Sequence, residues 1–169
     1  MRAFRLDSQP VSNREFLDFV KAHPEWKKSQ ASKSLQDGDY LNHWPGDEAV
    51  QPEDLDHPVR YVSYFAAEAY CEARGNKIPS LNQYRAAATD TGGDSLMGFS
   101  YDKPYKAPQF NFMQVEWSNT WWSGGPDPAK RIKYQHGTIH NNDPHSKYYT
   151  PAEDKRYTGR SLSFRCAEY

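Results

Sequence analysis

The sequence lacks a long apolar segment and carries almost no net charge. It contains no run of about 18 apolar residues, the length that a membrane-spanning helix requires. Its 21 basic and 22 acidic residues give a formal net charge of −1, and the mean hydropathy is −1.00. A chain with this balance has no basic footprint for nucleic acid or for an anionic membrane surface. We therefore expect no membrane insertion and no nucleic-acid partner.

The common sequence signatures of catalysis are also missing. There is no G-x-S-x-G nucleophile motif, no glycine-rich phosphate loop and no H-E-x-x-H metal motif. Charged residues are scattered, and the densest basic pairs, Lys27 with Lys28 and Lys130 with Arg131, are predicted to lie on solvent-exposed faces. The six charges within residues 1–20 exclude the apolar core of a secretory signal there.

Aromatic residues, by contrast, are abundant. The 169 residues include five Trp, twelve Tyr and eight Phe, and each such ring buries a large area when it enters a core. The length suits one domain with a complete core. We therefore predict a single domain over residues 1–169 whose core is built on large rings.

The first helix and the loop after it have clear local signals. Ser12 and Glu15 form a capping box, and the apolar residues that follow recur at helical spacing until Pro24. Residues 27–57 are polar and rich in turn formers, which predicts a long ordered loop. Its predicted anchors in the core are Tyr40, Leu41 and Trp44.

Two more helices are predicted in the middle of the chain. Ser63 can cap a helix over residues 64–74, and Gly75 would end it. Ser80 and Gln83 form a second capping box, which opens a third helix. Strands are expected near residues 2–6, 131–135 and 161–166. This order of elements indicates an α+β fold with functional residues in its loops.

Five segments, in the expected order, resemble the formylglycine-generating enzyme (sulfatase-modifying factor) family. The segments read V-S-N-R-E-F at 11–16, P-V-R-Y-V-S-Y-F-A-A-E-A-Y-C at 58–71, G-N-K-I-P-S-L-N-Q-Y-R-A-A at 75–87, V-E-W-S-N-T-W-W at 115–122 and L-S-F-R-C-A at 162–167. The resemblance implies a loop-rich α+β domain of the C-type lectin-like fold, with short strands and about three helices. Residues 16–26 and 40–44 are similar to a bacterial subgroup of this family. Such a member would be periplasmic if a leader was removed, and otherwise cytoplasmic.

The resemblance also assigns a role to Cys71 and Cys166. They match two cysteines that face each other in several relatives and can form a disulfide there. The residues themselves leave a second arrangement open, in which two buried thiols pack side by side. In either case we expect their Cα atoms to lie about 4–7 Å apart.

The catalytic segment of the family is altered in this chain. The family enzyme activates oxygen on copper(I), which is held by two cysteines in a segment like R-V-x-x-G-G-S-x-x-C-x-x-x-x-C. Residues 131–145 align with it and place His140 and His145 at the two cysteine positions. We therefore do not expect formylglycine production. Two interpretations remain, a polar surface loop or a rebuilt copper or iron site that uses His136, His140, Asp143 and His145.

A calcium site of the family is also in doubt. Glu116 matches one of its ligands, but Met113 stands where the family has an asparagine. Calcium requires about six oxygen ligands, so we expect this site to be lost. Glu116 would then accept backbone hydrogen bonds or pair with an arginine.

Two functional hypotheses follow from the resemblance. The first is a pseudoenzyme that binds a partner protein, as bacterial toxin-immunity proteins and accessory proteins encoded with copper nitrite reductases do, and that needs no cofactor. Its binding surface would use Trp117, Trp121, Trp122, Asn141, Asn142 and Tyr148. The second is a metal-dependent oxidase with His140 and His145 as ligands.

Overall fold

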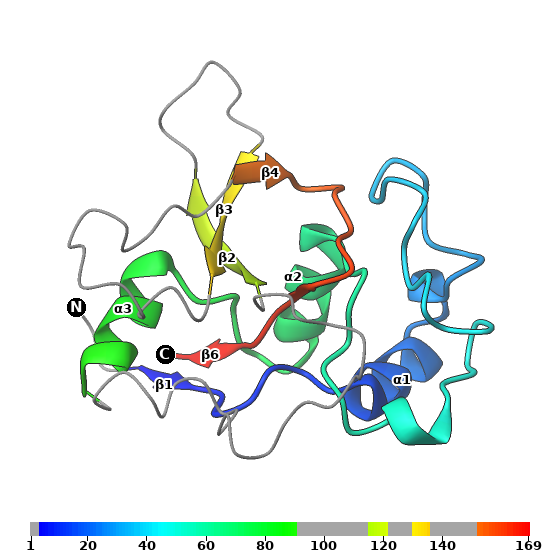
Figure 1. Cartoon of the computed structure of the whole chain (residues 1–169), viewed down its shortest axis with the longest axis horizontal. Coiled ribbons are helices and arrows are strands. Elements are labelled where there is room, and N and C mark those ends of the chain that lie inside the picture. The colour runs from blue at the N-terminus through cyan, green and yellow to red at the C-terminus, as the bar shows by residue number, and fades with distance from the viewer. Residues whose placement is uncertain (1–3, 91–114, 122–129, 136–151) are drawn as a thin grey trace.

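A computed structural model describes residues 4–90, 115–121, 130–135 and 152–169 (Figure 1). Its helices are α1 (Asn13–Ala22), α2 (Tyr64–Ala73) and α3 (Leu81–Asp90), with short 3-10 turns η1 (Pro24–Trp26) and η2 (Pro52–Asp54). Its strands are β1 (Arg5–Leu6), β2 (Val115–Trp121), β3 (Lys130–Gln135), β4 (Ala152–Asp154), β5 (Leu162–Ser163) and β6 (Ala167–Glu168). This architecture confirms the predicted α+β class. None of the described helices has the length and apolarity to cross a membrane.

Both predicted capping boxes are present. At the start of α1, the Glu15 N–H donates to Ser12 Oγ over 3.2 Å, and the Ser12 N–H donates to Glu15 Oε2 over 2.9 Å. Before α3, the Ser80 N–H donates to Gln83 Oε1 over 2.8 Å, and the Gln83 N–H donates to Ser80 Oγ over 3.3 Å. These bonds satisfy backbone groups that have no partner within the helix, so they fix where α1 and α3 begin.

The boundaries of α2 also follow from its flanking residues. The Ser63 hydroxyl accepts from the Ala66 N–H over 3.3 Å, which caps the helix. Gly75 has φ +73°, a left-handed conformation that glycine adopts without steric cost. The helix ends at Ala73, one residue before the predicted end.

Short strands form two sheets. The larger has the order β4-β3-β2-β5, in which β3 is antiparallel to both neighbours and β5 is parallel to β2. The smaller pairs β1 with β6, so Arg5–Leu6 and Ala167–Glu168 lie side by side although they are far apart in the sequence (Figure 1). The predicted strand over 161–166 is therefore wrong as one element. Phe164 and Arg165, both fully buried, separate β5 from β6 and turn into the core.

Large rings make up the core, as predicted. The centroid of the Phe16 ring lies 5.8 Å from that of Tyr70 and 6.0 Å from that of Phe164, so three distant segments meet around α1. Trp44 packs at 6.2 Å from the same ring. The predicted anchors of the long loop are all buried, with exposed fractions of 3% for Tyr40, 0% for Leu41 and 1% for Trp44.

The buried amide of Asn13 fastens the long loop to α1. Its Nδ2 group donates to the backbone oxygens of Asp54 (2.9 Å) and His57 (3.1 Å). Its Oδ1 atom accepts from Trp44 Nε1 (2.8 Å) and bonds His43 Nε2 (2.9 Å). One side chain therefore satisfies polar groups from the middle and from the end of the loop and holds both parts against α1.

Candidate functional site

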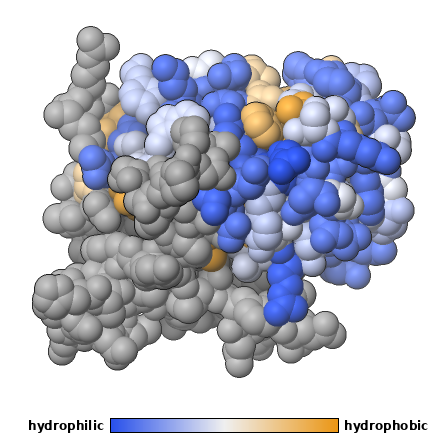
Figure 2. All heavy atoms as spheres, turned by 90° about the horizontal axis from the view of Figure 1, so that it is seen from above, coloured by the Kyte–Doolittle hydropathy of each residue, from blue (hydrophilic) through white to orange (hydrophobic). Residues whose placement is uncertain are grey.

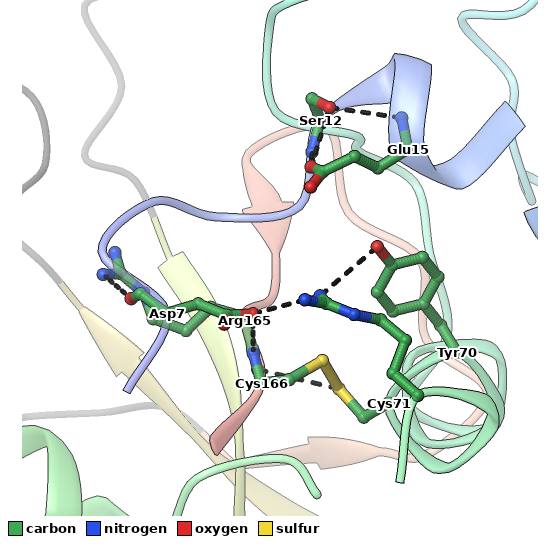
Figure 3. Close-up of polar contacts among 8 residues, drawn as sticks. Asp7, Ser12, Glu15, Tyr70, Cys71, Arg165 and Cys166 are labelled. Atoms are coloured by element: carbon green, nitrogen blue, oxygen red, sulfur yellow. Dashed lines mark hydrogen bonds and ion pairs between the residues drawn. A yellow bond between two sulfur atoms is a disulfide. The ribbon is translucent and has the colours of Figure 1, made fainter. Parts of the chain in front are cut away.

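The two cysteines connect α2 to the segment before β6. Cys71 and Cys166 form a disulfide, with their Cα atoms 5.6 Å apart (Figure 3). This separation agrees with the predicted range, and the structure has the disulfide rather than the pair of thiols. Both residues are fully buried. Because the chain has only these two cysteines, no thiolate remains in this arrangement.

This arrangement does not fit the copper(I) site that the resemblance implies. Copper(I) prefers soft thiolate ligands, and a disulfide sulfur carries no negative charge. Across the described ranges, no group of three or more His, Cys, Asp or Glu side chains is placed to hold a metal. The ligands suggested for a rebuilt site all lie outside the described residues, namely His136, His140, Asp143 and His145.

The predicted surface residues have different outcomes. The prediction that Trp117 lies on the binding surface is wrong, because its side chain is fully buried and its Nε1 group donates to the Val62 backbone oxygen over 2.9 Å. It lies within β2, which has β3 on one side and β5 on the other. Trp121, at the end of the same strand, is 51% exposed. The remaining candidates lie outside the described residues, namely Trp122, Asn141, Asn142 and Tyr148.

Glu116 pairs with an arginine, which is one of the two arrangements expected for it. Arg165 donates from Nε to Oε2 and from Nη2 to Oε1, both over 2.7 Å, and both side chains are fully buried. The Tyr84 hydroxyl donates to Oε2 over 3.0 Å. The Nη1 group of Arg165 donates to the backbone oxygen of Asp7 (Figure 3) and to that of Ser8. Both Glu116 oxygens thus serve an internal ion pair, which differs from the ligand role that the resemblance assigns.

The protonation of this pair is fixed by two opposing effects. Burial on its own lowers the pKa of Arg165, because it penalises the charged form. The charge of Glu116 and its hydrogen bonds outweigh burial, so the pKa of Arg165 is raised. The guanidinium therefore stays charged, and the pair acts as a permanent connection between β2 and the C-terminal segment.

A second group of charged and aromatic residues lies where β2 and β3 meet α2. We call it the aromatic–basic cluster, and its members are Tyr64, Phe65, Trp121, Arg131 and Lys155. Trp121 and Arg131 are paired across β2 and β3. The Tyr64 N–H at the start of α2 donates to the Lys155 backbone oxygen over 2.9 Å, which holds the residue after β4 against the helix.

Both cations of the cluster contact its rings. The Arg131 Cζ atom lies 3.3 Å from the centroid of the Trp121 ring and 5.0 Å from that of Tyr64. The Lys155 Nζ atom lies 4.5 Å from the centroid of Phe65, 5.0 Å from that of Tyr64 and 5.8 Å from that of Trp121. Contacts of this kind are attractive because the face of an aromatic ring carries partial negative charge.

Arg131 is the most deeply placed charge of the cluster. It is only 5% exposed, so the prediction that Lys130 and Arg131 share a solvent-exposed face is wrong for Arg131. Its Nε and Nη1 atoms have no hydrogen-bond partner in the part of the chain that the structure describes. Burial lowers its pKa, while the Tyr64 hydroxyl and the Glu68 carboxylate act in the opposite direction.

Large hydrophobic side chains are rare on the described surface. Figure 2 shows one face of the molecule, on which the described residues are mostly hydrophilic with a few small hydrophobic areas. The large hydrophobic side chains that are exposed among the described residues are Trp121, Tyr157 and Tyr169. An exposed ring that packs on a buried charge is therefore unusual on this surface.

Sequence reasoning identified only one member of the cluster as a functional candidate. Trp121 was found through its aromatic character, whereas Arg131 was assigned to a solvated face. The signal for Arg131 was its place on the predicted strand 131–135, where one face of a sheet must be covered. Nothing in the local sequence marks Lys155, because its proximity to Tyr64 depends on the fold.

Comparison with known proteins gives a family and one relative. The model of the family described as a sulfatase-modifying factor enzyme 1-like domain matches residues 1–157. The serine/threonine-protein kinase pkn1 of Chlamydia pneumoniae is 22% identical over 129 residues, which cover 76% of this chain and 20% of the kinase. The match thus spans about a fifth of the kinase. Because the family model covers most of the sequence, the chain belongs to the family of sulfatase-modifying factor enzyme 1-like domains.

Proposed function

We propose that this domain is a catalytically degenerate member of its family that recognises a partner protein, in the manner of a bacterial toxin-immunity or accessory protein. One observation carries the first half of this proposal. Cys71 and Cys166 are consumed by a buried disulfide, and the chain has no other cysteine. No thiolate is therefore left to hold copper(I), and the altered segment 131–145 has His140 and His145 at the two cysteine positions of the family.

The aromatic–basic cluster supports the second half. Tryptophan, tyrosine and arginine are the residues that dominate binding energies at protein interfaces. Trp121 is half exposed, yet its ring is already packed against Arg131, so little side-chain freedom remains to be lost on binding. A preorganised ring of this kind favours a recognition role for the cluster.

Partner binding can be tested with two matched aromatic substitutions. A tagged domain captures its partner from an extract of the native host, and the purified pair is then measured by isothermal titration calorimetry. Trp121→Ala should weaken binding about tenfold or more, as expected for an interface hot spot. Tyr169→Ala is the control, because Tyr169 is also exposed, at 62%, but lies outside the cluster. Equal affinities of the two variants would argue against the cluster as the binding surface.

A metal-dependent oxidase is the second candidate. Its basis is the alignment that places His140 and His145 at the two cysteine positions of the family. Elemental analysis of the purified protein separates the two functions. About one copper or iron per chain, lost in both His140→Ala and His145→Ala, would favour the oxidase. The binding-protein proposal predicts no stoichiometric metal.

A further inference from the structure

We propose that Arg131 and Lys155 bind a carboxylate of the partner protein, from an aspartate or glutamate side chain, beside the rings of Trp121, Tyr64 and Phe65. This inference rests on the proposed function, because it names the chemical group by which the partner is recognised. It assigns the aromatic–basic cluster a ligand of defined charge and shape.

The first argument is the incomplete hydrogen bonding of Arg131. Arg165 in the same protein shows how a buried guanidinium is satisfied, with bonds from Nε and Nη2 to Glu116 and from Nη1 to two backbone oxygens. Arg131 is almost as deeply buried, but its Nε and Nη1 atoms have no partner among the described residues. Buried donors of a charged group are normally satisfied, so an acceptor is expected there.

The second argument is the repulsion between the two cations. Arg131 and Lys155 contact two of the same rings, those of Tyr64 and Trp121. Within the described ranges, neither cation forms an ion pair. Two like charges in one half-buried group of rings repel each other, and an anion placed with them removes that cost.

The charges nearby favour a carboxylate over a phosphate. Glu68 is the acidic group that acts on Arg131, and its Oε1 atom accepts from the Tyr64 hydroxyl over 3.2 Å. Glu72 also acts on Tyr64, and Glu153 is the β4 partner of Arg131, so carboxylates already lie near the two cations. A singly charged ligand adds less repulsion with them than a doubly charged one. A phosphate carries close to two negative charges at neutral pH, so it would leave an excess negative charge among the rings.

Access to the cluster is provided by Trp121. This ring is half exposed while its face contacts the buried guanidinium, so the cluster reaches the surface of the protein at Trp121. Apolar walls next to a cation also strengthen a charge-assisted hydrogen bond, because they lower the local dielectric constant. An acidic side chain next to an apolar one would match both features.

Nuclear magnetic resonance can test the inference with defined probes. The acetylated, amidated tripeptide Gly-Glu-Gly is titrated into ¹⁵N-labelled protein, and the signals of Arg131 Nε–H and the Trp121 indole N–H are followed. The matched peptide Gly-Gln-Gly and sodium sulfate, at equal ionic strength, are the comparison arms. We expect saturable shifts of both signals with the glutamate peptide alone. Equal shifts with the glutamine peptide, or stronger shifts with sulfate, would overturn the carboxylate assignment.

Substitutions in the aromatic–basic cluster test whether it binds the glutamate peptide. Lys155→Met should weaken binding of the glutamate peptide about tenfold, because it removes one charge-assisted contact. Arg131→Lys keeps the charge but removes the guanidinium, so it should weaken binding by a similar factor while a circular dichroism spectrum confirms folding. Arg14→Gln is the matched control, because Arg14 is exposed on α1 and paired with Asp56. A loss of binding in Arg14→Gln as large as in Lys155→Met would refute the site.

The inference and the proposed function can fail separately. If the captured partner binds wild type and Lys155→Met equally well, the carboxylate site is refuted while protein recognition stands. If no partner is captured but the glutamate peptide binds as expected, the site stands as a carboxylate site and the proposed function loses its support.

Discussion

Arg165 and Glu116 form a doubly hydrogen-bonded ion pair in the centre of the domain, although 49 residues separate them along the chain. Each of the two bonds is 2.7 Å long, and both side chains are excluded from solvent. The pair connects β2 to the segment between β5 and β6. Removing one partner would leave the other charge buried and uncompensated, which is far more costly than losing an exposed pair.

Breaking this pair should destabilise the fold strongly. We expect Glu116→Gln to lower the free energy of unfolding by about 3–5 kcal/mol, measured by urea denaturation. Arg5→Gln is the control, because Arg5 and Glu168 form an exposed pair at 3.6 Å, and such pairs contribute about 1 kcal/mol or less. Comparable losses in the two variants would contradict the central role of the buried pair.

The disulfide should contribute much of the stability. Cys71 and Cys166 are 95 residues apart, so their bond closes a long loop and restricts the unfolded chain. The double variant Cys71→Ala/Cys166→Ala is expected to lose about 2–5 kcal/mol of unfolding free energy. Dithiothreitol should destabilise wild type and have no effect on the double variant. If wild type is insensitive to the reductant under denaturing conditions, the bond is absent in solution.

Mild acid should destabilise the domain through His43. Burial lowers the pKa of His43 to about 3, and the charges of Arg60 and Lys28 add to this effect. The unfolded chain protonates its histidine at a pKa of about 6.5, so stability is complete above that pH and is lost as pH falls from there toward 3. The loss due to His43 is about 2 kcal/mol at pH 5.

Unfolding free energies measured at pH 7 and pH 5 would check whether His43 causes the loss of stability in acid. His43→Gln keeps an N–H donor for Asn13 without a titrating group, so its stability should vary less between the two pH values. His23→Gln is the control, because the His23 side chain is 41% exposed. A pH dependence of His43→Gln that equals that of wild type would exclude His43 as the source.

Because Asn13 makes several buried hydrogen bonds, replacing it with alanine should lower the free energy of unfolding strongly. Asn13→Ala leaves the Trp44 indole N–H without its acceptor inside the core, so we expect a loss of about 2–4 kcal/mol in urea denaturation. Asn82→Ala is the matched control on α3, where the side chain is exposed, and it should change stability by about 0.5 kcal/mol or less. Similar effects of the two substitutions would show that the loop is not fastened through Asn13.

Features encoded by neighbouring residues could be predicted from the sequence. The capping boxes at Ser12 and Ser80 lie within four residues of the helix starts that they define, so the local pattern was sufficient. The family was predicted from the order of five motifs, and the match over residues 1–157 confirms it. Cys71 and Cys166 were placed close together by the resemblance, and not by any local pattern.

Features that depend on distant partners could not be predicted in the same way. Strand β2 carries Glu116, Trp117 and Ser118 in succession, and all three are buried. The Tyr64 ring packs on Trp117, and Arg165 and Tyr84 bond Glu116, so side chains from other segments cover both faces of the strand. The sequence alternates apolar and polar residues over 115–118, which predicts one covered and one exposed face, whereas burial does not alternate there. Trp117 was assigned to the surface and Arg131 to solvent because their actual neighbours, Val62 for Trp117 and the rings of Tyr64 and Trp121 for Arg131, are distant in the sequence.

The proposal that this domain has lost its family's catalysis can be tested by mass spectrometry of a substrate peptide. A peptide that contains C-x-P-x-R is incubated with the protein, copper and air, and an active enzyme of the family serves as the positive control. We expect the cysteine of the peptide to remain unchanged, because His140 and His145 stand at the two copper-binding cysteine positions and no cysteine lies between residues 72 and 165. Conversion of that cysteine to the aldehyde at a rate above the protein-free sample would contradict the proposal.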